Sequence, residues 1–166
     1  MIQKGKIKQM LQNAREYRIH CYRRMQLADM ADDSCEYFVQ EYWQERTEAS
    51  ENAARLLDDI DTHTNKLNPE EQSELLLTAF VAINAAFRDY ELSLRAAEMA
   101  EMLLPNLPDS RVKLYLQVYL YHEIGDDIIH EEIDRLMEMI ETGDDKTEED
   151  RCLMELYRQM SEQDFA

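Results

Sequence analysis

The sequence predicts an all-α protein of about seven helices that pair as antiparallel hairpins. Only three Gly and three Pro occur in 166 residues, so few positions stop a helix. Apolar residues recur at steps of three and four along most of the chain, which is the spacing of one helix face. A chain of this length can bury one core, and we therefore expect a single domain over residues 1–166.

Residues 1–67 are expected to form a long N-terminal helical hairpin. The first helix runs from about Ile2 to Met30, and residues 32–34 supply capping side chains before a second helix that extends to about Lys66. The apolar stripe of the first helix consists of Ile7, Met10, Leu11, Ala14, Tyr17, Cys21, Met25 and Ala28. Because only a short acidic turn joins them, the two helices should lie antiparallel.

Residues 68–143 are expected to form two further helix pairs. Asn68 and Pro69 give a clear helix start, with Asn as the capping residue and Pro at the first helical position. The segment from Leu75 to Phe87 is nearly all apolar or small. A helix that is apolar on every side must be covered on more than one side, so this helix should be the central one.

Helix stops and starts divide the rest of the chain. Pro105, Gly125 and Gly143 end the next three helices, because Pro cannot continue a helix and Gly favours the C-terminal cap. A capping box then begins at Thr147 and starts a last helix over residues 147–163. We expect this helix to cap the end of the domain.

Large and small side chains recur at matching places in the two central helix pairs. In the first pair these residues are Leu77, Phe80, Val81, Asn84, Asp89, Tyr90, Ser93, Ala97, Ala100 and Pro105. In the second pair they are Leu114, Val118, Tyr121, Gly125, Asp126, Ile129, Ile133 and Leu136. This pattern resembles the tetratricopeptide repeat, a helix pair of about 34 residues. The resemblance implies a right-handed stack of helix pairs that binds a peptide or protein on its concave side.

The concave side that the resemblance implies carries small and aromatic residues. They are Thr78, Ala82, Ala85, Tyr115, Tyr119 and His122. Independently of the resemblance, Tyr115, Tyr119 and His122 share one helix face through their spacing of i, i+4 and i+7. Aromatic side chains with a polar tip, opposite a row of small residues, would suit an apolar helix or an extended peptide. The alternative is that the first or last helix covers this face as ordinary core.

Charge is divided unevenly along the chain. The formal net charge is −18, yet the first 24 residues hold seven Lys or Arg and one acid. Lys8, Arg15, Arg18 and Arg23 fall largely outside the apolar stripe of the first helix. This basic helix can pack on the acidic body of the same chain, contact a partner or a second copy, or bind an acidic membrane surface. Packing within the chain is the simplest of these.

The acidic body limits the partners of the chain. It repels the phosphates of nucleic acids, so direct binding to nucleic acid is not expected. The carboxylates form either a solvated surface or a contact surface for a basic protein. For the second case, the candidate contact residues are Asp126, Asp127, Glu131, Glu132, Asp144 and Asp145.

The sequence carries no motif of a known catalytic class. It has no Gly-rich phosphate loop, nucleophile elbow, His-Glu-x-x-His or paired-Cys zinc pattern. Asp127 and His130 have a spacing used in helical metal sites, but the acids around them also suit an exposed turn at a helix start. Three separated cysteines, no membrane span and no secretory signal predict a cytoplasmic protein. We expect no enzymatic activity, no metal and no cofactor.

We therefore predict a non-enzymatic protein–protein interaction module, an adaptor or scaffold, that binds a peptide or helix of a partner in a helical groove. The alternative is an acidic inhibitor or nucleic-acid mimic that occupies a basic surface on its target. The two differ in salt dependence, because only the acidic inhibitor should lose its partner steeply as ionic strength rises. A homodimer through the first hairpin also remains open.

Overall fold

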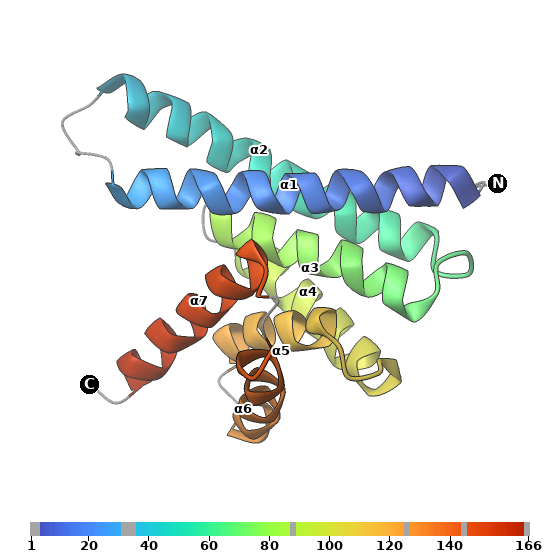
Figure 1. Ribbon diagram of the computed structural model, residues 1–166. Coiled ribbons are helices and arrows are strands. Elements are labelled where there is room, and N and C mark those ends of the chain that lie inside the picture. The colour runs from blue at the N-terminus through green and yellow to red at the C-terminus, as the bar shows by residue number, and fades with distance from the viewer. Residues whose placement is uncertain (1–3, 31–35, 87–88, 125–126, 144–145, 165–166) are drawn as a thin grey trace.

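Seven α-helices and one short 3-10 helix make up the described part of the chain, in which no strand occurs (Figure 1). The computed structural model describes the backbone of residues 4–30, 36–86, 89–124, 127–143 and 146–164, and the side chains of residues 5–23, 44–86, 89–123, 131–143 and 146–158. The helices are α1 Lys4–Met30, α2 Glu36–Thr62, α3 Pro69–Ala85, α4 Tyr90–Leu103, η1 Leu104–Asn106, α5 Arg111–Ile124, α6 Asp127–Glu141 and α7 Glu148–Asp164. The prediction of an all-α fold is confirmed.

Capping side chains fix the starts of α3 and α7 where the sequence predicts them. Before α3, the Glu71 amide donates to Asn68 Oδ1 at 2.8 Å, and the Asn68 amide donates to Glu71 Oε1 at 2.9 Å. Before α7, the Asp150 amide donates to Thr147 Oγ1 at 3.0 Å, and the Thr147 amide donates to Asp150 Oδ2 at 2.9 Å. Each pair satisfies two amides that have no partner within the helix.

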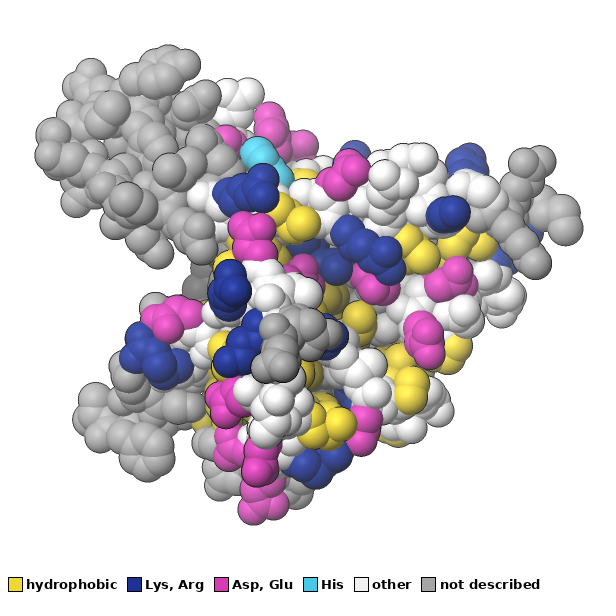
Figure 2. Space-filling view, in the orientation of Figure 1, with side chains coloured by type: hydrophobic (Ala, Val, Ile, Leu, Met, Phe, Trp, Pro, Cys, Tyr) yellow, Lys and Arg dark blue, Asp and Glu magenta, His cyan; other side chains and the backbone are white. Residues whose placement is uncertain are grey.

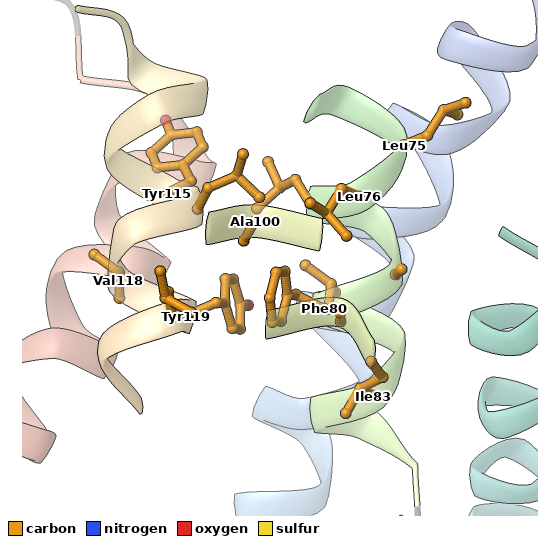
Figure 3. Close-up of a cluster of buried hydrophobic side chains, with 14 of the residues drawn as sticks. Leu75, Leu76, Phe80, Ile83, Ala100, Tyr115, Val118 and Tyr119 are labelled. Carbon is orange, nitrogen blue, oxygen red and sulfur yellow. The ribbon is translucent and has the colours of Figure 1, made fainter. Parts of the chain in front are cut away.

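Helix α3 is the central helix, as its apolar sequence predicts. It contacts α1, α2, α4 and α5, and the side chains from Leu75 to Ile83 are buried. Figure 3 shows the ring of Phe80 on α3 facing the ring of Tyr119 on α5. These rings are stacked, with centroids 5.8 Å apart and an angle of 14° between their planes. The core of the domain is therefore built around α3 and α5.

The helices contact each other in a regular order. Each odd-numbered helix contacts the next odd-numbered one, so that α1, α3, α5 and α7 follow in succession. The even-numbered helices pack beside them: α2 contacts α3, α4 contacts α3 and α5, and α6 contacts α5. Helix α1 also contacts α7, so the contacts among α1, α3, α5 and α7 form a closed ring. The described helices include none with the length and apolar character that a membrane crossing requires.

Candidate protein-interaction site

The face predicted to bind a partner lies inside the protein. Thr78, Ala82, Tyr115 and Tyr119 are buried, Ala85 is half-buried, and only His122 is exposed. These residues therefore do not form one open groove, and the prediction of an open groove is wrong. The structure agrees with the alternative prediction, in which helices of the same chain cover this face. Helix α1 reaches this face at Thr78, which accepts a hydrogen bond from Arg18, and α7 reaches it at Tyr115, which donates to Asp150.

A buried arginine joins α1 to the rest of the protein. Arg18 lies on α1 and is 5% exposed. Its Nη1 donates to Glu74 Oε2 at 3.0 Å and to Thr78 Oγ1 at 3.0 Å, both on α3, and its Nε donates to Glu149 Oε2 on α7 at 3.2 Å. We call these four residues the Arg18 cluster. One guanidinium can serve all three acceptors because it carries five donors in a planar fork.

The protonation states of the Arg18 cluster follow from its surroundings. Burial lowers the pKa of Arg18, but attraction to Glu149 and Glu74 outweighs burial, so the pKa is raised. Burial raises the pKa of Glu149, and Arg18 opposes this rise. The guanidinium is therefore charged throughout the physiological range. Two further basic residues of α1 pair with acids of the body: Arg15 with Glu74 at 3.3 Å and Arg23 with Glu148 at 3.4 Å.

The basic first helix thus packs against acidic residues of its own chain, as predicted. Figure 2 shows basic and acidic side chains interspersed on the face that α1 and α7 turn to the viewer. Arg18 itself was predicted outside the apolar stripe, and this is wrong. It lies four residues after the buried Ala14 and four before the buried Tyr22. That spacing, which places all three on one helix face, was the available signal.

Tyr115 and Asp150 hold α7 against α5. The Tyr115 hydroxyl donates a hydrogen bond to Asp150, and Arg111 Nε donates to Asp150 Oδ2 at 3.0 Å. Burial raises the pKa of Asp150, but the hydrogen bonds from Tyr115, the Thr147 amide and Arg111 outweigh burial and hold it below its ordinary value. The polar tip of Tyr115, which was predicted to meet a partner, therefore binds the chain's own last helix.

The predicted acidic contact surface is described only in part. Asp126, Asp144 and Asp145 lie outside the described residues, and Asp127 belongs to α6 without a described side chain. Glu131 is exposed. Glu132 pairs with Arg135 at 2.6 Å, and its hydrogen bond with Arg135 is the largest cause that lowers its pKa. Whether this surface binds a partner stays a prediction.

A groove of about 900 Å³ separates α6 from α7. Acidic side chains of α6, such as Glu138 and Glu141, line one wall, and basic side chains of α7, such as Arg151 and Arg158, line the other. Since the walls carry opposite charges, the groove favours neither an acidic nor a basic ligand. Within the described residues, no three His, Cys, Asp or Glu side chains gather in a way that could hold a metal ion.

Comparisons with known proteins give one solved structure of the same fold. No family model matches the chain, and no curated protein matches it, so the tetratricopeptide resemblance stays a prediction. The structure is similar to UpxZ from Bacteroides uniformis, described as a transcription anti-terminator antagonist, with a TM-score of 0.67. The two chains share a fold. The likeness covers 92% of this chain and 92% of UpxZ, at 20% sequence identity.

Proposed function

We propose that this chain is a regulatory protein that binds a transcription anti-terminator protein and antagonises it. The likeness to the antagonist UpxZ over 92% of both chains is the observation that supports this proposal. An antagonist that acts by occupying a surface of its target requires neither catalytic residues nor a cofactor. The sequence predicts a protein-binding function of the same kind, and a cytoplasmic location where transcription takes place.

The charge of the chain favours an action on protein over an action on nucleic acid. With a net charge of −18, the chain is repelled by the phosphates of the template and the transcript. A protein that works beside those phosphates needs basic surfaces, and an acidic antagonist is attracted to such surfaces. The prediction of an acidic inhibitor therefore describes the proposed antagonist better than that of an adaptor or scaffold.

Transcription with purified components tests this function. The assay contains RNA polymerase, a template with one terminator, and an anti-terminator from the organism that encodes this chain. We expect added chain to reduce read-through to the level seen without the anti-terminator, and to change nothing when the anti-terminator is left out. Unchanged read-through at saturating chain would refute the proposal. A fall in read-through without the anti-terminator would instead indicate action on the polymerase or nucleic acid.

A further inference from the structure

Exposed apolar side chains gather on one helix. Among the described residues, four large apolar side chains are more than half exposed: Tyr90 at 68%, Leu94 at 62%, Met102 at 76% and Met139 at 59%. The first three lie on α4, and their spacing of four and eight residues places them on one side of it. The opposite side of α4 packs into the core through Ala96 and Ala100. Single exposed apolar residues are normal on protein surfaces, whereas a group on one face indicates a contact surface.

Acidic residues lie between these apolar residues. Glu91, Glu98 and Glu101 are exposed on the same side of α4, and no cation of the described residues pairs with them. We call Tyr90, Glu91, Leu94, Glu98, Glu101 and Met102 the α4 face. The base within α4 itself is Arg95, which pairs with Asp58 at 2.9 Å and with Asp61 at 2.6 Å, both on α2. Arg95 is thus already neutralised by acids of α2, and the described side chains of the α4 face are negative as well as apolar.

We propose that the α4 face is the surface that binds the partner, and that it binds a basic amphipathic segment. Such a segment presents apolar side chains to Leu94 and Met102 and Lys or Arg side chains to Glu98 and Glu101. Apolar contacts at the centre supply most of the affinity, while the charge pairs around them supply selectivity and fast association. The assignment of this segment to an anti-terminator rests on the proposed function. The basic and amphipathic chemistry of the segment rests only on the side chains of the α4 face.

A second copy of this chain does not suit the α4 face. In a two-fold dimer the same patch meets itself, so Glu91, Glu98 and Glu101 would face the same three acids of the other copy. Like charges brought together at an interface oppose association. The α6–α7 groove is a weaker candidate than the α4 face, because its two walls offer opposite charges to one ligand.

An apolar and a charge variant of the α4 face, each with a control on α6, test the inference. Leu94→Gln with Met102→Gln removes its apolar contacts, and Met139→Gln on α6 is the apolar control. Glu98→Gln with Glu101→Gln removes two of its charges, and Glu131→Gln with Glu138→Gln on α6 removes the same number elsewhere. All these side chains are exposed, so the fold should be unaffected, and circular dichroism checks this.

The first probe is a fluorescein-labelled helical peptide of Leu and Lys, followed by fluorescence anisotropy at 150 mM salt. We expect the Leu94/Met102 variant to weaken peptide binding by about tenfold or more, as for central residues of an interface. The Glu98/Glu101 variant should weaken it severalfold and flatten its salt dependence. Both α6 controls should bind like the wild type. Equal losses from the α4 and α6 variants, or a larger loss from α6, would overturn the inference.

The second probe is the anti-terminator itself in the read-through assay. Antagonism by the wild type that the Leu94/Met102 variant loses and Met139→Gln keeps supports both proposals. Antagonism that every variant keeps overturns the α4 face and leaves the proposed function standing. No antagonism by the wild type refutes the proposed function alone, since the peptide result decides the α4 face. Light scattering that shows a dimer, lost in the Leu94/Met102 variant, would assign the face to a second copy and overturn the inference.

Discussion

Replacing Arg18 with methionine should lower the free energy of unfolding by about 3 kcal/mol. The substitution keeps most of the apolar stem but removes the guanidinium that lies between Glu74 and Glu149. These carboxylates are 14% and 12% exposed at the side chain. Glu149 would be left nearly buried without a cation, and Glu74 would keep only its pair with the exposed Arg15. Loss of one partner from a fully buried ion pair costs about 3–5 kcal/mol, and the slight exposure of both acids places the expected loss at the lower end.

Urea unfolding followed by circular dichroism measures this loss, and a thermal scan gives a second estimate. For a chain of this length, the midpoint temperature should fall by about 6–12 °C. The control is Arg15→Met, which removes an arginine that pairs with the same Glu74 at 3.3 Å but is 59% exposed. Since solvent screens an exposed pair, the control should lose less than about 1 kcal/mol.

A second substitution separates the effect of charge from the effect of packing. Glu149→Gln in the Arg18→Met background removes one stranded carboxylate, and we expect it to recover about 1 kcal/mol or more. If Arg18→Met costs no more than Arg15→Met, the two acids are solvated and the Arg18 cluster does not hold α1 in place. If Glu149→Gln recovers nothing, the charge of Glu149 does not account for the loss.

Three further changes test the core, a helix start and the attachment of α7. Phe80→Ala should cost about 3–4 kcal/mol in urea unfolding by leaving a cavity beside α5, and a loss below 1 kcal/mol would contradict the buried ring stack. Asn68→Ala should cost about 1 kcal/mol by removing the α3 cap, and an unchanged midpoint would count against it. Tyr115 and Arg111 help to hold the pKa of Asp150 below its ordinary value. Ionised Asp150 therefore stabilises the fold at any pH above its ordinary pKa, and this stabilisation is lost as the pH falls through the folded-state pKa. The difference in unfolding free energy between wild type and Asp150→Asn should therefore be constant near neutral pH and shrink below about pH 4; a difference that grows in acid would reverse the assigned sign.

Local sequence signals predicted most of the fold. The capping boxes at Asn68 and Thr147 fixed two helix starts, because they depend on residues only three positions apart. Pro105 follows the end of α4, as expected for a residue that cannot continue a helix. The central place of α3 followed from its apolar residues on every side. Each of these features depends on short-range geometry, which a sequence displays directly.

The candidate site was harder to predict because it depends on distant parts of the chain. The α5 residues from Leu114 to Tyr121 are all buried, so periodicity could not tell whether a partner or the chain's own helices cover the Tyr115 side. Arg18 was expected at the surface because it is charged, and its partners lie 56 and 131 residues away. Leu94 and Met102 lie on the side of α4 opposite the buried Ala96 and Ala100, so the apolar periodicity that marks core residues does not include them.

Isothermal titration calorimetry of the purified chain with the anti-terminator tests the central claim most directly. The account predicts saturable one-to-one binding that weakens as salt is raised, together with no binding of the chain to the RNA or DNA on which the anti-terminator acts. An absence of heat with the anti-terminator, or saturable binding of the chain to the nucleic acid itself, would contradict it.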